Sequence, residues 1–320
     1  MKLFLFVLAA SLLLTFVSGL YVFVVGCVRR KDLPWLVEQE IKQTSYGKYY
    51  DFIVRSDKWL KDHNVQDVYI NSHDGLKLHG LWIPAANARG TVLFAHGYRS
   101  TMLVDFGLAF DFYHTHGMNL LVPDQRCHGK SEGRYITFGV KESRDMQNWL
   151  DYHNRQLSTV PVILSGLSMG ASTMLYLADK DLPENVKGII ADCGFTSPKD
   201  ILASVFTRVI HLPAAPTLWV TDILARLFAG FRLDEQDTRR SLERSRLPVF
   251  LVHGTNDDFV PCEMTKAGYA ACTGEKHLLL VEAAGHGLSF LVAKEKYTAM
   301  IKDFLDQHIG KEKENGMHQG

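Results

Sequence analysis

The stretch Val160-Pro-Val-Ile-Leu-Ser-Gly-Leu-Ser-Met-Gly170, continued by Ala171-Ser-Thr-Met-Leu-Tyr-Leu-Ala178, indicates both the architecture and the chemistry of this chain. An apolar run, a Gly-x-Ser-x-Gly turn and a helix-forming segment follow one another, which predicts a buried strand, a sharp turn and a helix. Gly166 and Gly170 leave room where strand and helix approach each other, so the turn can hold Ser168 in a strained conformation with its hydroxyl exposed. The pattern therefore predicts a serine nucleophile.

The composition is that of an ordinary globular protein. The 320 residues are 47% apolar and 22% charged, which is enough for one large α/β domain. Lysine and arginine together number 35, as do aspartate and glutamate, so no basic field favours a nucleic-acid partner. The five cysteines form no Cys-x-x-Cys pair, so neither a zinc site nor a disulfide framework is indicated.

Residues 3–28 carry no charge and are followed by Arg29-Arg30-Lys31. A helix of this length spans about 39 Å at 1.5 Å per residue, which exceeds the roughly 30 Å hydrocarbon core of a bilayer. The apolar region of a cleavable signal peptide is only about 7–15 residues long. We therefore expect residues 1–31 to be a single-pass anchor in the cell membrane, with its basic flank.

The side of the membrane depends on the flanking charge. Three cations follow the apolar stretch and only Lys2 and the terminal amine precede it, so the positive-inside rule predicts a cytoplasmic body. In the alternative, Val24-Val-Gly-Cys27 resembles a bacterial lipoprotein processing box. The body would then lie at the outer face, tethered through a lipid on Cys27 or through an uncleaved signal.

Short apolar segments alternate with helical segments along the rest of the chain. We expect a hairpin from 68–70 and 76–83 around Ser72-His-Asp-Gly75, then strands at 91–95, 119–122, 160–164, 186–190, 248–252 and 277–281. Helical patterns occupy 143–153, 171–179, 262–271 and 290–308. This alternation predicts a mostly parallel sheet of eight strands with helices on both faces.

Segments outside this alternation divide the chain further. We expect a helical linker at 32–64, the main domain at 65–308 and a polar, disordered tail at 309–320. Within the main domain, 197–246 forms a small helical cap with two apolar runs, 201–212 and 217–228. It is either a pair of helices that completes the core or a lid that selects substrate at the strand ends.

A serine becomes a nucleophile when a histidine accepts its proton and a carboxylate orients that histidine. His286 lies between two glycines just after the last strand, and Asp257 and Asp258 follow the strand before it. In this type of sheet the chain order is serine, acid, histidine. Spacing alone does not separate the two aspartates, and either one has the alternative role of capping a loop.

An acyl-transfer reaction also needs two N–H donors for the developing oxyanion. Met169 follows the nucleophile and begins a helix, so its backbone N–H is one candidate. The loop His96-Gly-Tyr-Arg-Ser100 follows the strand at 91–95, which makes the backbone N–H of Tyr98 the second candidate. His96 itself is a less favoured base because a triad is already supplied.

The block Pro123-Asp-Gln-Arg-Cys-His-Gly-Lys-Ser-Glu-Gly133 completes a set of motifs in which the chain resembles the α/β hydrolases over roughly 65–308. Members of that superfamily often carry Asp-x-Arg-Gly-His-Gly-x-Ser here, so Cys127 stands where glycine is usual. The resemblance implies that Asp124, Arg126 and His128 support the loop. The superfamily pattern His-Gly-x-x-Asp-x-x-Val-Pro selects Asp257 as the acid.

The anchor, the basic flank, the block Ile190-Ala-Asp-Cys-Gly-Phe195 and the small cap resemble membrane-anchored bacterial hydrolases of the YqkD type, grouped with serine aminopeptidase-like members. This resemblance implies a serine hydrolase that acts on an acyl ester, a thioester or an amide without a metal or cofactor. Apolar cap residues, among them Val205, Phe206, Leu218, Trp219 and Phe228, favour an ester with an acyl chain. Amide hydrolysis and a non-catalytic, membrane-tethered binding protein of this fold are the alternatives.

Overall fold

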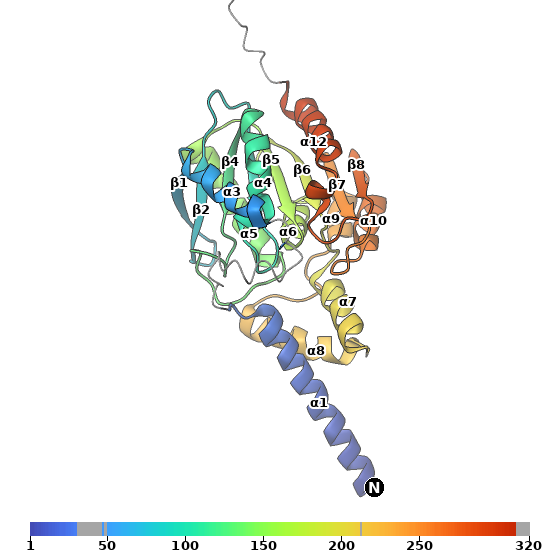
Figure 1. The fold of residues 1–320 in the computed structure, drawn as a ribbon. Helices are drawn as coiled ribbons and strands as arrows, with labels where there is room; N and C mark the ends of the chain where they lie inside the picture. Colours follow the sequence, from blue (N-terminus) through green and yellow to red (C-terminus); the bar gives the residue numbers. More distant parts are fainter. Residues whose placement is uncertain (31–46, 48–49, 212, 312–320) are drawn as a thin grey trace, which may run out of the picture.

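An eight-stranded sheet forms the centre of the protein (Figure 1). The computed structural model describes residues 1–30, 47, 50–211 and 213–311. All eight strands expected from the sequence are present, with bounds that differ by at most three residues. They are β1 (Gln66–Asn71), β2 (Lys77–Ile83), β3 (Gly90–Ala95), β4 (Met118–Pro123), β5 (Val162–Leu167), β6 (Val186–Asp192), β7 (Val249–Gly254) and β8 (Lys276–Val281).

The strand order is β1-β2-β4-β3-β5-β6-β7-β8. The expected hairpin joins β1 and β2 with Tyr69 opposite His79, and β2 also runs antiparallel to β4. All other pairings are parallel, so the sheet is mixed with a parallel majority. Because β3 to β8 share one direction, the loops at their carboxyl ends gather at one edge of the sheet.

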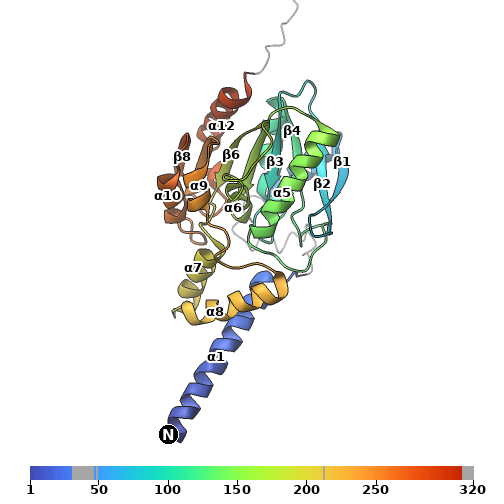
Figure 2. The same cartoon turned by 180° about the vertical axis from the view of Figure 1, so that it is seen from behind.

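Helices cover both faces of the sheet (Figures 1 and 2). One layer holds α3 (Tyr50–Lys61), α4 (Met102–Thr115) and α12 (Lys294–Ile309), and the other holds α5 (Val140–Tyr152), α6 (Met169–Leu175), α9 (Thr238–Arg244) and α10 (Cys262–Ala271). The turns η2 (His153–Leu157) and α11 (Ser289–Val292) complete these layers. The sequence patterns did not predict α4, because this helix is apolar on most sides and shows no distinct polar face.

The cap consists of α7 (Pro198–Ile210) and α8 (Ala215–Leu224), and α8 is prolonged by the π-helical turn η3 (Ala225–Ala229). The two expected helical runs are thus present between β6 and β7. Helix α1 (Lys2–Cys27) projects from the same end of the molecule and crosses α8 (Figure 1). Buried side chains of α1, α8 and the strand-end loops form a third apolar cluster beyond the two faces of the sheet.

Helix α1 is the one helix of the described residues that is long and apolar enough to cross a membrane, judged by length and composition. Two expectations fall partly or wholly outside the described residues. The first half of the linker at 32–64 lies outside them, whereas α3 occupies the second half and packs on α4, with Trp59 donating to Asp111 at 3.1 Å. Residues 312–320 of the expected tail also lie outside.

Candidate active site

The turn between β5 and α6 holds Ser168 in a strained backbone conformation. Its φ is 55° and its ψ is −117°, a region that residues other than glycine rarely adopt. The two glycines of the motif make this possible: a Cβ on Gly170 would lie 1.8 Å from the carbonyl oxygen of Ala95, and one on Gly166 would lie 2.3 Å from that of Gly170. The serine N–H donates to the carbonyl of Asp192 at 2.8 Å, which fixes the turn to β6.

The three residues of the expected catalytic triad form a continuous chain of hydrogen bonds, which we call the relay. His286 Nε2 is 2.9 Å from Ser168 Oγ, and His286 Nδ1 is 2.7 Å from Asp257 Oδ2. These residues follow β8, β5 and β7, so parallel strands deliver all three to one edge. The structure brings Asp257 to the imidazole, whereas Asp258 is exposed and its carbonyl accepts from Arg208.

Four groups hold the buried carboxylate of Asp257. Burial opposes its ionisation, but hydrogen bonds with His253 and His286 outweigh this effect and keep the pKa of Asp257 well below its usual range. The other carboxylate oxygen accepts the N–H groups of Phe259 and Val260 at 2.9 and 2.8 Å. A carboxylate that stays charged can orient His286 and stabilise its protonated form.

In the loop after β3, some backbone N–H groups are hydrogen-bonded within the protein and others are free to bind a ligand. Gly97 N–H donates to Asp105 Oδ2 at 2.6 Å, and Arg99 N–H donates to His128 Nε2 at 3.0 Å. Within the described part of the chain, the N–H groups of Tyr98 and Met169 have no hydrogen-bond partner. Both predicted oxyanion donors are therefore available to a bound oxygen.

Asp105 holds the loop at 96–100, which we call the oxyanion loop after its proposed role, and no motif in the sequence indicated this role for Asp105. Besides Gly97, it accepts the Ser100 hydroxyl at 2.6 Å. Burial raises the pKa of Asp105, although these two hydrogen bonds oppose the rise. The residue lies on α4, the helix that the sequence patterns missed. His96 is also a supporting residue, because its Nε2 accepts the N–H of Gln125 at 3.0 Å.

The residues of the block at 123–133 support the loop, as the resemblance implied. Asp124 contacts the ring of His79 at 2.7 Å, and Arg126 makes paired hydrogen bonds to both Asp145 and Asp74. Cys127, which stands where the superfamily usually has glycine, adopts a strained backbone conformation with a positive φ of 68°. Glycine adopts this conformation without strain.

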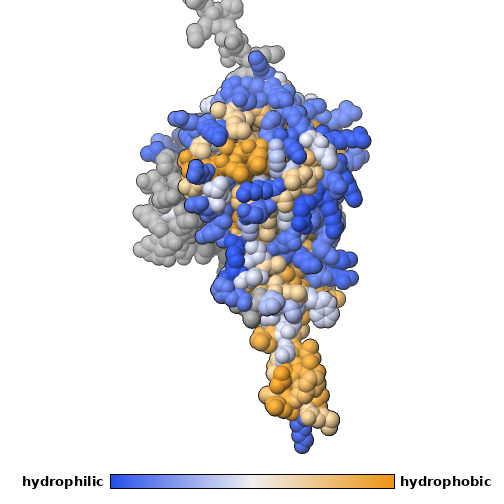
Figure 3. Space-filling model, turned by 90° about the vertical axis from the view of Figure 1, so that its right-hand side faces the viewer, coloured by the Kyte–Doolittle hydropathy of each residue, from blue (hydrophilic) through white to orange (hydrophobic). Residues whose placement is uncertain are grey.

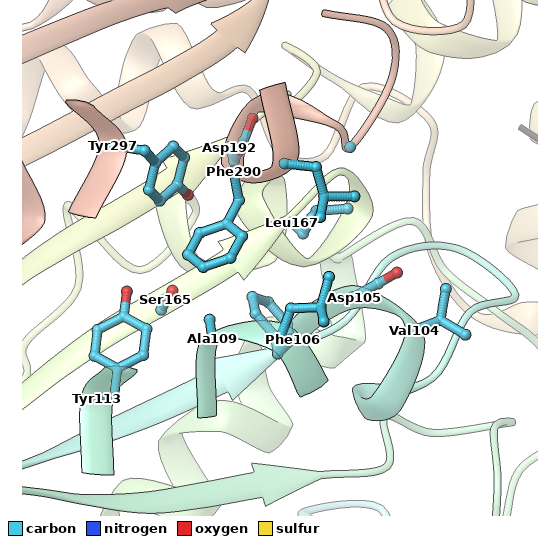
Figure 4. Close-up of a pocket in the computed structure, with 13 residues that line it drawn as sticks. Val104, Asp105, Phe106, Ala109, Tyr113, Ser165, Leu167, Asp192, Phe290 and Tyr297 are labelled. Atoms are coloured by element: carbon cyan, nitrogen blue, oxygen red, sulfur yellow. The ribbon is translucent and has the colours of Figure 1, made fainter. Parts of the chain in front are cut away.

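A pocket lies beside the relay, between α4 and the segment that follows His286 (Figure 4). It contains about 530 Å³ of empty space, open solvent included. Figure 4 shows Val104 and Asp105 at one end and two tyrosines at the other. Its lining combines apolar and polar groups: Val104, Asp105, Phe106, Leu108, Ala109, Tyr113, Ser165, Leu167, Asp192, Gly287, Phe290, Leu291 and Tyr297. Leu167 and Gly287 are the chain neighbours of Ser168 and His286, so the pocket lies next to the site.

Among the described residues, three groups of side chains bring potential metal ligands within 4.8 Å of one another: Cys193, Asp257 and His286; Glu275, His277 and His308; and His73, Asp74 and Asp145. The first group overlaps the relay, and burial raises the pKa of the Cys193 thiol well above its usual value. A protonated thiol is a poor ligand. Both aspartates of the third group already pair with Arg126.

Comparisons with known proteins agree with this architecture. Residues 86–221 match the family model described as serine aminopeptidase, S33. The chain is 27% identical over 238 residues to the uncharacterized protein YqkD of Bacillus subtilis, which covers 74% of this chain and 78% of that protein. It is 24% identical over 247 residues to the uncharacterized protein YfhR of Escherichia coli, with the same coverage.

A solved structure of similar fold is the esterase Pf2001 of Pyrococcus furiosus. It superimposes with a TM-score of 0.64 and 25% sequence identity. The match covers 78% of this chain and 94% of the esterase. The shared region therefore accounts for nearly all of the archaeal protein and leaves part of the present chain unmatched.

Proposed function

We propose that this chain, which belongs to the α/β-hydrolase superfamily, is a serine hydrolase that cleaves an ester bond with Ser168, His286 and Asp257. The observation that carries the proposal is the continuous relay from Ser168 Oγ through His286 to the buried carboxylate of Asp257. Loop-capping alone does not account for Asp257, because one of its oxygens faces the imidazole. The strained turn adds to this, since a protein retains such strain where function needs it.

The reaction proceeds in two steps. His286 Nε2 takes the proton of Ser168 as Oγ attacks the acyl carbon, and the carbonyl oxygen becomes an oxyanion held by the N–H groups of Tyr98 and Met169. Collapse breaks the bond to the leaving oxygen, which receives the proton from His286. Water then attacks the acyl-serine with His286 again as base, which releases the acid and restores the serine. These residues supply every proton transfer, so the reaction needs no cofactor.

An ester is the favoured substrate for two reasons. The similar archaeal structure is an esterase, and the apolar cluster of the cap reaches Met169 at the site. Amide hydrolysis is the second candidate, favoured by the serine aminopeptidase family model. Turnover of matched ester, thioester and aminoacyl-amide substrates distinguishes these possibilities.

Contacts at the end of α1 support the proposal that the apolar segment stays on the protein as an anchor. The carbonyl of Cys27 accepts the N–H of Ile136 at 2.7 Å, and the Arg29 guanidinium donates to the carbonyls of Ser131 and Gly129. Cleavage beyond Cys27 would remove the contact with Ile136. The Cys27 thiol is fully buried, which disfavours a lipid on it. We therefore propose a single-pass membrane protein with a cytoplasmic hydrolase domain, a topology that protease accessibility in intact cells tests.

Labelling with a fluorophosphonate tests the proposed chemistry. The wild-type protein should be modified, and Ser168→Ala should not, because the reagent captures only an activated serine. Ser158→Ala, at a half-buried surface position, is the matched control and should label like the wild type. A wild-type protein that stays unlabelled would favour the non-catalytic binding protein.

A further inference from the structure

Helix α8 has two apolar faces, and only one of them is covered. Val220 packs against Gly19 of α1, and the hydroxyls of Ser18 and Thr217 lie 2.9 Å apart. Away from this contact, Trp219 is 68% exposed, and Leu227 on η3 is 72% exposed. Phe228 is 59% exposed, although its ring lies 6.1 Å from that of Phe23 on α1. Large apolar groups gathered in this way on a protein surface mark a contact with lipid or protein.

The length of α1 places the exposed face of α8 at the level of the bilayer surface. Nearly all residues from Lys2 to Val17 are exposed (Figure 3). These 16 residues extend about 24 Å at 1.5 Å per residue, whereas a bilayer core of about 30 Å needs about 20 residues. If α1 spans the membrane, the hydrocarbon boundary therefore lies near Ser18 to Phe23. This is the level at which α8 crosses α1.

We propose that the outer face of α8 and η3 lies in the interface of the bilayer that α1 spans, and that the substrate reaching Ser168 is an acyl ester carried in that bilayer. The second clause rests on the proposed function. Tryptophan is enriched at membrane interfaces because its ring is amphipathic. Arg226 is exposed beside Leu227, where a cation on a long side chain can reach lipid headgroups.

The polar groups of α8 are compatible with this placement. The Asp222 carboxylate accepts the N–H of Leu233 at 2.8 Å, and the Thr221 hydroxyl donates to the carbonyls of Thr217 and Gly19. Polar groups that are paired within the protein lower the cost of leaving water.

The end of α1 sets the distance from the bilayer to the reaction centre. The Tyr98 hydroxyl donates to the carbonyl of Gly26 at 2.9 Å, and the Arg99 guanidinium donates to those of Val25 and Val28 at 2.7 and 2.9 Å. Gly26 lies seven residues beyond Gly19, or about 10 Å along the helix. The oxyanion loop is thus held just above the interface. From the level of Gly19, an acyl ester needs to rise by about 10 Å to reach this loop, with its chain along the apolar cluster.

Fluorescence quenching tests the position of the face directly. The full chain is reconstituted in phosphatidylcholine vesicles with bromine on the acyl chains near the headgroup, and the signal of Trp219→Phe is subtracted from that of the wild type. We expect Trp219 emission to fall at least twofold compared with unbrominated vesicles. Trp59, isolated in the same way through Trp59→Phe on the distant α3, should be unaffected. Unquenched Trp219 overturns the inference, whether water or another protein covers the face.

Activity tests the consequence for the substrate. The double variant Trp219→Gln, Leu227→Gln should lower the ratio of turnover of a vesicle-borne long-chain ester to that of a water-soluble ester by about tenfold, because two apolar side chains lose their lipid contact. Tyr69→Gln is the matched control, since this 44% exposed aromatic residue lies on the edge strand β1. An unchanged ratio in the double variant overturns the inference. Wild-type protein inactive on both esters contradicts the proposed function instead.

Discussion

The turn around Ser168 and the junction between α1, α8 and the oxyanion loop lie at the same end of the sheet, but different features of the sequence determine them. In the turn, close backbone contacts demand glycine, since a Cβ on Gly170 would lie 1.8 Å from the Ala95 carbonyl oxygen. In the junction, Tyr98 and Arg99 donate to backbone carbonyls of α1. A carbonyl is present at every residue, so this contact leaves no mark in the sequence of α1.

Chemistry determines the residue types in the turn, whereas packing between distant segments determines the junction. The turn needs particular residue types within five positions, and the relay needs a carboxylate and an imidazole at strand ends. The junction joins segments about 70 to 200 residues apart through contacts such as that between Ser18 and Thr217. Substitutions in the two regions should therefore affect different quantities, the chemical step in the turn and the docking of the anchor in the junction.

The largest effect is expected from Asp257→Asn. The asparagine amide would keep the shape of the site but remove the charge that orients His286, so kcat should fall by roughly 10⁴. Asp258→Asn, a matched change one residue further along, should alter kcat less than about twofold because that side chain is exposed. Steady-state kinetics with a water-soluble ester measures both, and equal losses in the two variants would contradict the assignment of the acid.

The sequence predicted the eight strands, which the structure confirms, because strand periodicity is a local signal. The five proposed site residues come from local motifs at strand ends, and their roles stay a prediction. It predicted Asp257 over Asp258 only through the superfamily pattern, and the structure adds the geometric reason, a carboxylate oxygen 2.7 Å from the imidazole. Asp105 and its helix α4 were missed, because a helix that is apolar on most sides lacks helical periodicity.

The cap was the least predictable region. Trp219 was expected to favour an acyl chain within the site, but it is 68% exposed on the far side of α8. A pattern of apolar residues shows that a helix has two apolar faces without showing which face meets which neighbour. The contact of Val220 with Gly19 decides this, and it depends on the path of α1.

A second prediction concerns the charge buried beneath the turn. Burial raises the pKa of Asp192 from 3.8 to about 6. Below about pH 4 the group is protonated in both states, and between about pH 4 and 6 only the unfolded chain loses the proton, so stability falls as pH rises through this window. The total loss is about 3 kcal/mol.

Asp192→Asn removes this titration, so the stability of the variant relative to the wild type should rise between pH 4 and 6 in denaturant unfolding. The junction offers the contrasting control. Thr217→Val removes the hydroxyl contact with Ser18, which has no titrating group, so its effect on stability should be constant across the same window. Parallel pH profiles for wild type and Asp192→Asn would show that Asp192 carries no such cost.

A third prediction asks whether the two regions are coupled. Tyr98→Phe keeps the backbone N–H proposed for the oxyanion hole but removes the hydroxyl that joins Gly26 and Arg99. We expect kcat to fall roughly three- to tenfold with KM unchanged, the size of one lost hydrogen bond. Tyr135→Phe is the control, because within the described residues the Tyr135 hydroxyl makes no hydrogen bond. Equal kcat values in both variants would mean that the junction does not position the loop.

The smallest effect is expected from Gly19→Ala. Its Cβ would lie 2.5 Å from Val220 Cβ, so α8 must shift away from α1. The contact should weaken by about 1 kcal/mol, at the low end for overpacking because the outer face of α8 leaves room to move. Gly26→Ala is the matched control on the same helix, since its Cβ would meet Phe138 at an ordinary 3.5 Å.

Disulfide formation between Ser18→Cys and Thr217→Cys measures this change, because the two wild-type hydroxyl oxygens are 2.9 Å apart. The pair should cross-link readily in the otherwise wild-type chain and in Gly26→Ala, and more slowly in Gly19→Ala. The triad lies outside this contact, so turnover of a water-soluble ester should stay the same in all three backgrounds. A cross-linking rate that is indifferent to Gly19→Ala would mean that α8 does not pack on α1 at this glycine, and the level of the bilayer inferred from that contact would then be wrong.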